Sequence, residues 1–167
     1  RLSLVGSEMC IRDSFNPAVS LIFWLKKIIS LSDLVAYVLF QIIGAIFGCL
    51  AANIIFELPI ITISTNVRHD LSQFLSEILA TFGLVLVIFL AREVARLNIP
   101  VLVGSYIASA YWFTSSTSFA NPAVTIARQF SDTFTGISPS GIPSFVLAQI
   151  FGAILGYIVV RWLFRGV

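Results

Sequence analysis

Apolar residues occur in this chain as long uncharged runs separated by short charged segments. Asp33 and Glu57 enclose 23 uncharged residues, a second run over about 71–91 contains only Glu77 as a charge, and two further uncharged runs cover 97–127 and 133–160. A helix needs about 20 apolar residues to cross the hydrocarbon core of a bilayer. The pattern therefore predicts four membrane-spanning helices, at about residues 33–56, 71–92, 98–117 and 143–164.

Two other apolar segments, 16–25 and 121–131, are too short to cross a bilayer. Each begins with the sequence Asn-Pro-Ala-Val. About ten helical residues rise only about 15 Å, which is half the hydrocarbon thickness. The unpaired N–H groups at the start of such a helix cannot face lipid. We therefore expect two half-helices that dip into the protein and begin near the bilayer midplane.

An internal repeat relates the two halves of the chain. Residues 38–48 (VLFQIIGAIFG) and 146–156 (VLAQIFGAILG) are identical at eight of eleven positions, and an Asn-Pro-Ala-Val box precedes each of them. Three predicted crossings separate the copies, so the second copy is expected to be inverted in the membrane. Inverted repeats with broken helices can build a substrate path. Two GxxxG pairs are expected to pack helices closely, Gly44/Gly48 and Gly152/Gly156.

The basic residues favour one side of the predicted membrane. Tracing the crossings from the first half-helix places six lysines and arginines on that side and two on the other. The positive-inside rule makes the six-charge side cytoplasmic, so we expect a multi-pass protein of the cell (inner) membrane. The six are Lys26, Lys27, Arg92, Arg96, Arg161 and Arg165, and the two are Arg68 and Arg128.

Composition excludes several classes of function. Of the 167 residues, 58% are hydrophobic and 11% are charged, whereas soluble domains carry about 25% charged residues. A soluble globular enzyme, a disordered chain and, with a net charge of +2, a nucleic-acid-binding protein are excluded. The only histidine, His69, cannot form a metal site by itself. No nucleophile with a base is visible, so we expect no catalytic residue and no cofactor.

The first fourteen residues, 1–14 (RLSLVGSEMCIRDS), stand apart from the rest of the chain. They resemble the translation of a sequencing-adapter sequence, a contaminant of assembled reading frames, and lack the order of a signal peptide. The alternative is an ordinary polar tail. Without Cys10 in this segment, Cys49 is a single cysteine in an apolar run, so no disulfide framework is expected.

Two Asn-Pro-Ala boxes, each followed by an apolar half-helix and a helix that carries Gln and GxxxG, resemble the aquaporin (major intrinsic protein) family over about 15–165. This resemblance implies an all-α membrane protein, an aquaporin-like inverted repeat of spanning helices with two re-entrant half-helices. The family has six spans, so residues 15–167 are expected to be a channel domain lacking its first two helices, with four of six present. The resemblance also implies a homotetramer with one pore per subunit.

The chemistry of the boxes can be derived from their residues. Asn is a favoured N-cap, and Pro suits the first helical position. Each helix N-terminus carries about half a positive charge, so two facing ends oppose cations and protons. We expect the side-chain amides of the two asparagines to donate hydrogen bonds to a passing oxygen. The alternative is that the boxes only cap and pack. The predicted pore residues are Asn16, Pro17, Ala18, Asn121, Pro122 and Ala123.

By resemblance, a selectivity filter lies near the outer mouth. Many family members carry arginine directly after the second box, but Val124 occupies that position here. Counting without gaps places two further filter positions at Ser109 and Ser118. These small, uncharged side chains imply a wider pore than that of a strict water channel. The second box is similar to those of bacterial aquaporin-like channels associated with arsenic-resistance operons, which implies metalloid hydroxides or small polyols as cargo.

Two charged residues in the predicted helices have alternative interpretations. Arg128 lies one turn beyond Val124 on the same helix face; it could be a displaced filter arginine, but we prefer an interfacial arginine that pairs near Asp132. Glu77 is the one carboxylate within an expected span, and such residues are often functional. The family resemblance favours a structural role, in which Glu77 accepts hydrogen bonds from backbone near the second box, over a proton relay.

These observations favour a passive channel for water and small neutral solutes, with the lipid bilayer as its surroundings. The alternative is an ion-coupled secondary transporter, since such proteins also have inverted repeats and broken helices. Coupled transport usually needs charges within the membrane, and only Glu77 qualifies.

The expected absence of two helices leads to a prediction about conductance. The 167-residue polypeptide, reconstituted in liposomes, should give no solute flux above background, because part of the pore wall would be missing. The full-length gene product that contains residues 15–167 should conduct. Light-scattering measurements of solute uptake compare the two, and equal flux from both would contradict the prediction.

Overall fold

The computed structural model describes residues 15–92 and 99–164, and within these ranges the regular structure is helical. Residues 1–14, 93–98 and 165–167 lie outside the described part, so the proposed artefact at 1–14, Arg96 and Arg165 are not placed. The elements are α2 (Pro17–Leu25), α3 (Leu31–Ile55), α4 (Leu71–Leu90), α5 (Ile99–Phe113), α6 (Pro122–Ala127), the 3-10 helices η2 (Arg128–Phe130) and η3 (Pro139–Gly141), and α7 (Ile142–Leu163).

Three of the four predicted crossings are confirmed as helices long and apolar enough to span a membrane. These are α3, α4, and α7 with its preceding turn, over Pro139–Leu163. Helix α3 begins two residues before its predicted start because Ser30 and Asp33 form a capping box, in which each side chain accepts from the other's backbone N–H at 3.1 Å.

The prediction for the third crossing was wrong in its extent. It placed a helix over 98–117, but α5 ends at Phe113 and has 15 residues. The chain then forms an irregular loop over 114–120, in which Thr117, Ser118 and Ala120 have positive φ angles of 62°, 48° and 47°. This loop carries the chain back from the end of α5 to the start of the second half-helix, which a longer helix could not do.

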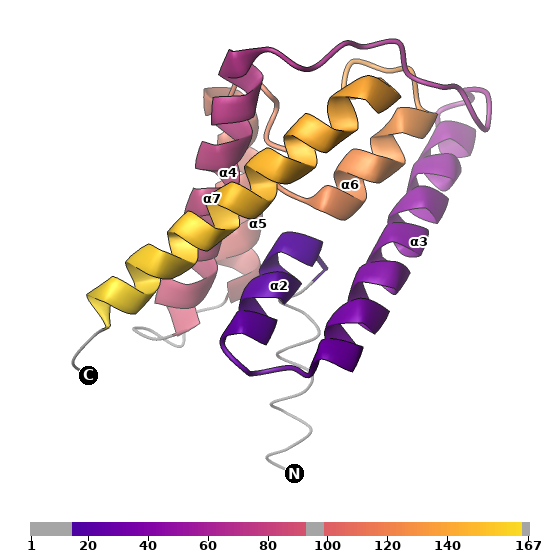
Figure 1. Cartoon of the computed structure of the whole chain (residues 1–167). Helices are drawn as coiled ribbons and strands as arrows, with labels where there is room; N and C mark the ends of the chain where they lie inside the picture. The colour runs from indigo at the N-terminus through magenta and orange to yellow at the C-terminus, as the bar shows by residue number, and fades with distance from the viewer. Residues whose placement is uncertain (1–14, 93–98, 165–167) are drawn as a thin grey trace.

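The two half-helices begin side by side in the middle of the molecule and run toward opposite ends (Figure 1). Helix α2 has nine residues, and α6 with η2 covers the second predicted segment. Their opposite directions are those expected of an inverted repeat. Lys26 and Lys27 directly follow α2, Arg92 follows α4, and Arg161 lies in the last turn of α7, so these charges gather at the end where α3 begins (Figure 1).

Helices α4 and α7 form the most extensive helix pair and hold the half-helices between them and α3. A Cβ atom at Gly152 would clash with the carbonyl oxygen of Ile78, and one at Gly156 would lie 3.0 Å from that of Phe82. The backbones therefore meet where α7 carries its GxxxG pair. At Gly44 and Gly48 on α3, by contrast, an added Cβ would meet no described atom within 4 Å.

The close approach at Gly152 generates a stability prediction. Gly152→Ala should lower the stability of the full-length gene product by about 1–3 kcal/mol, because the added methyl group meets backbone that cannot move aside. Gly104→Ala on α5 is the matched control, since a Cβ there meets no described atom within 4 Å. Thermal unfolding in detergent should show a lower Tm for Gly152→Ala only. Equal Tm values for the two variants would contradict this packing.

Candidate functional site

Each half-helix begins with an asparagine that caps its own first turn. The Asn16 side-chain oxygen accepts from the backbone N–H of Ala18 at 2.9 Å. The Asn121 oxygen accepts from Ala123 at 3.0 Å and from Val124 at 3.4 Å. Both asparagines have extended backbone, and proline follows each at the first helical position. The sequence Asn-Pro therefore starts both helices and satisfies their first N–H groups locally.

The same two asparagines also tie the half-helices together. The Asn16 amide nitrogen donates to the carbonyl oxygen of Ala120 at 2.6 Å, and that of Asn121 donates to Phe15 at 2.9 Å. Each box thus bonds to the residue that precedes the other box. An amide group has two N–H donors, so one N–H of each asparagine remains for another acceptor.

Glu77, fully buried on α4, organises the approach to the second box. One carboxylate oxygen accepts from the backbone N–H of Phe119 at 2.8 Å and from the Ser116 hydroxyl at 2.6 Å. The other accepts from the backbone N–H of Ala120 at 2.8 Å and from the Gln149 amide at 2.6 Å. These are the backbone contacts near the second box that the family resemblance implies for this residue.

The contacts of Glu77 explain how the loop before the second box keeps an unusual backbone. Left-handed conformations cost non-glycine residues about 1–3 kcal/mol each and persist where surrounding structure imposes them. Ser118 and Ala120 have such conformations, and the N–H groups bonded by Glu77 belong to Phe119 and Ala120. The carboxylate therefore compensates strain in the segment that leads directly into Asn121.

In each half of the chain, a glutamine of the repeated segment donates a hydrogen bond to a hydroxyl group of the half-helix. Gln149 on α7 donates to the Thr125 hydroxyl at 2.8 Å, and Gln41 on α3 donates to the Ser20 hydroxyl at 3.0 Å. Each hydroxyl lies four residues after its box asparagine. The sequence resemblance included the two glutamines but predicted no contact for them. The repeat contained a signal, because both glutamines are among its identical positions.

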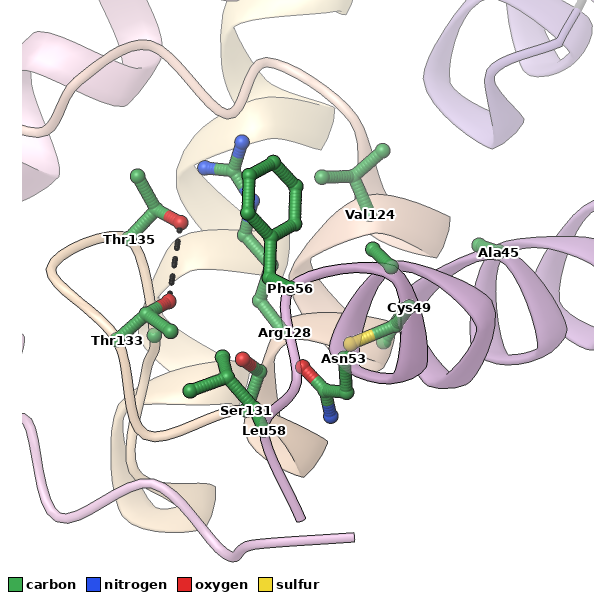
Figure 2. Close-up of a pocket in the computed structure, with 13 residues that line it drawn as sticks. Ala45, Cys49, Asn53, Phe56, Leu58, Val124, Arg128, Ser131, Thr133 and Thr135 are labelled. Carbon is green, nitrogen blue, oxygen red and sulfur yellow. Dashed lines mark hydrogen bonds between the residues drawn. The ribbon is translucent and has the colours of Figure 1, made fainter. Parts of the chain in front are cut away.

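Two cavities meet beside the second half-helix. The first, of about 350 Å³, is lined by both box asparagines, by Ser118 and by apolar side chains of α4 and α5 that include Ile88 and Ile107. The second, of about 630 Å³, lies between the end of α3, α6 and the loop before η3 (Figure 2). Val124 and Arg128 line both cavities, so these two residues form the wall that the cavities share.

The predicted filter residues are only partly brought together. Val124 and Ser118 line the first cavity, and the Ser118 hydroxyl is buried without a hydrogen-bond partner. Ser109 does not line this cavity: it lies on an exposed face of α5, where its hydroxyl donates to the Ser105 carbonyl at 2.8 Å. The residues of α5 that do line it are Ile99, Pro100, Val103 and Ile107.

The preferred interpretation of Arg128, an ion pair near Asp132, is not what the structure shows. Asp132 accepts from the backbone N–H of Thr65 at 2.9 Å and from the hydroxyls of Ser64 and Thr65 at 3.3 Å. Arg128 lies with its Cζ atom 4.1 Å from the centre of the Phe119 ring. The positive charge is attracted to the electrons of the ring face, so the guanidinium packs on Phe119.

Arg68 is the other basic residue that we predicted on the side opposite the cytoplasm, and its side chain bonds to the loops there. Its guanidinium donates to the carbonyl oxygens of Gly136, Ser116 and Phe134 at 2.8, 3.1 and 2.6 Å. Burial lowers the pKa of Arg68, and the negative charge of Glu77 opposes that shift. Arg68 therefore clamps the segments on either side of the second half-helix.

Comparison with known proteins assigns this chain to a family. The family model described as "Major intrinsic protein" matches residues 13–115. The chain is 48% identical over 151 residues to "Aquaglyceroporin AqpS" of Rhizobium meliloti (strain 1021). The chain belongs to the major intrinsic protein family. The matched region covers 90% of the chain and 65% of that relative, so this family member spans about two thirds of the relative's length.

Family membership and three long apolar helices together make this major intrinsic protein a multi-pass protein of the inner membrane. The predicted family and the predicted all-α membrane fold are thereby confirmed. The family model ends before the second box, so the pairing of the two boxes rests on the geometry described above, in which residues 104 and 106 positions apart in the sequence are hydrogen-bonded.

The four donors around Glu77 generate a prediction that separates a structural role from a proton relay. Glu77→Gln should lower the Tm and the solute flux of the full-length gene product, because the new amide places a donor against existing donors. Each unsatisfied buried group costs about 1–3 kcal/mol. Glu57→Gln, at an exposed position, is the control.

Flux and Tm should be measured from about pH 5 to pH 8. A Glu77→Gln variant with unchanged Tm that has lost a pH dependence of flux would identify a proton relay instead and would contradict the structural role.

Proposed function

We propose that this major intrinsic protein is a passive channel for water and small neutral solutes, and not an enzyme. The observation that carries the proposal is the crossed pair of hydrogen bonds between the boxes, Asn16 to Ala120 and Asn121 to Phe15. These bonds hold two helix N-termini against one another inside the protein, with a cavity alongside that both asparagines line.

The remaining hydrogen-bonding capacity of the asparagines supports selection of neutral oxygen-bearing molecules. Their side-chain oxygens already accept from backbone N–H groups, whereas one amide N–H of each is left to donate. A water or hydroxyl oxygen can accept such a bond. A cation or a hydrated proton needs acceptors, and the asparagine oxygens already bond to the first N–H groups of their own helices.

The helix dipoles act in the same direction. Each helix N-terminus carries about half a positive charge, and α2 and α6 direct both toward the middle of the molecule (Figure 1). We propose that the paired ends exclude cations and protons electrostatically, because the positive ends of half-helix dipoles raise the energy of a positive charge in the pore.

The cavity wall supports cargo larger than water. The side chains of α4 and α5 in it are aliphatic, and Val124 supplies a short apolar side chain after the second box. Such a wall accommodates the carbon or metalloid core of a small molecule while donors on the other side bind its hydroxyls. We propose small polyols or metalloid hydroxides such as arsenite as solutes; the name of the Rhizobium meliloti relative, an aquaglyceroporin, agrees with the first class.

The assignment of the polar residues extends this proposal. We assign Asn16, Pro17, Ala18, Asn121, Pro122 and Ala123 to the pore motifs, and Ser118 and Val124 to the filter. Ser109 remains a proposed filter position whose hydroxyl, in the described part of the chain, bonds within its own helix. From family membership we also propose a homotetramer.

An ion-coupled transporter that uses Glu77 is the alternative function. Its carboxylate is fully buried and accepts four hydrogen bonds that hold the loop before Asn121. A proton relay would break these bonds in each cycle, so their number supports the channel.

Transport kinetics distinguish the two functions. In liposomes that contain the full-length gene product, glycerol uptake should rise linearly with the gradient and be unaffected by an uncoupler, because a channel has no obligatory ion step. Asn121→Ala should reduce the flux and Arg161→Gln, at the opposite end of the molecule, should not. Uptake that saturates at low concentration and requires a proton gradient would establish the transporter instead.

A further inference from the structure

The junction between the two cavities carries a cation whose role is not explained by the paired boxes. Arg128 follows α6 directly, one turn beyond Val124. Both residues line the cavity of about 350 Å³ beside the boxes and the cavity of about 630 Å³ that Figure 2 shows. A solute in either cavity therefore lies beside these two side chains. Val124 offers it only an apolar surface, and Arg128 offers it a charge.

The guanidinium of Arg128 is positioned but not neutralised. Its Nη1 atom is buried and has no hydrogen-bond partner, and the structure gives it no ion pair among the described residues. The nearby carboxylates have other partners: Asp132 accepts from Thr65 and Ser64, and Glu77 accepts from four donors. A buried donor without a partner is costly, which makes each one in a folded protein a candidate for ligand contact.

Arg128 packs on a residue of the loop that is hydrogen-bonded to Glu77. Arg128 lies over the ring of Phe119 at 4.1 Å, and the backbone N–H of Phe119 donates to Glu77 at 2.8 Å. The Phe119 ring also packs edge-on against Phe145, with centroids 5.3 Å apart. The position of the charge is thus determined by packing on Phe119, which itself packs on Phe145 of α7.

Arg68 shows by contrast what a structural arginine does at this end of the molecule. It lies 5.2 Å from the same ring, but three of its N–H groups donate to backbone carbonyls. Both arginines are cations beside Phe119. Within the described residues, only Arg128 of this pair has a buried donor without a partner and lines the two cavities.

We propose that Arg128 is a specificity-determining residue of the pore, which repels cations at the junction of the cavities and donates from Nη1 to the oxygen of a neutral solute. The inference rests on the proposed channel function. Val124 is then the complementary feature, because its apolar side chain leaves Arg128 as the charged group of this part of the wall. The Ser118 hydroxyl, buried in the same cavity without a partner, is a second polar contact for that solute.

Urea and guanidinium form a matched pair of probes, since they share a planar shape and size and differ by one charge. Their uptake should be measured in liposomes that contain the full-length gene product. Arg128→Gln should raise the ratio of guanidinium to urea permeability by about tenfold or more, because a unit charge a few ångströms from the path no longer opposes the cation. Arg128→Lys should keep the wild-type ratio, and Arg161→Gln is the control for removal of an exposed arginine.

A second variant tests position as well as charge. Val124→Arg in the Arg128→Gln background moves the cation one turn toward the boxes, and it should restore exclusion of guanidinium while it slows urea. An unchanged permeability ratio in Arg128→Gln, with urea flux intact, would overturn the proposal. Loss of urea flux in Arg128→Gln, Arg128→Lys and the double variant together would make Arg128 a folding residue and would overturn it as well. Failure of the channel function is a different result, namely no gradient-driven urea flux in the wild type.

Discussion

The structure depends on one constraint, which is that backbone N–H and C=O groups inside a membrane protein must find partners within the protein. Two helices that begin in the middle of the molecule leave several N–H groups unpaired. Asn16 and Asn121 satisfy part of this demand by capping their own helices, and each then uses its amide to bond the backbone that enters the other box. The boxes thereby stabilise each other, and the donors left over face a cavity.

The inverted repeat extends from the boxes to the helices that support them, and its differences are as informative as its matches. Gln41 with Ser20 and Gln149 with Thr125 occupy equivalent positions and make equivalent hydrogen bonds. Gln149 additionally bonds to Glu77, which holds the left-handed loop before the second box. Helix α7 packs its glycines against α4, whereas the glycines of α3 meet no described atom.

Arg68 and Arg128, the two arginines beside Phe119, differ in their hydrogen bonds. Arg68 uses its donors on carbonyl oxygens of the surrounding loops and so fixes their course. Arg128 is oriented by an aromatic ring and retains a buried donor at the junction of two cavities. The same residue type therefore contributes stability at one position and, in our proposal, selectivity at the other. The difference arises from the partners that the fold provides, since both are arginines beside Phe119.

The sequence by itself determined the spanning helices, the two half-helices and their inverted relation, because uncharged length, Asn-Pro starts and a repeat are properties of the chain read in order. It overextended α5 by four residues, since the loop over 114–120 is as uncharged as the helix before it and is held by Glu77, about 40 positions earlier. Only the tertiary structure decided the bonds between the boxes, the face on which Ser109 lies and the partners of Asp132 and Arg128. Those depend on distances between groups remote in sequence, which neither periodicity nor composition encodes.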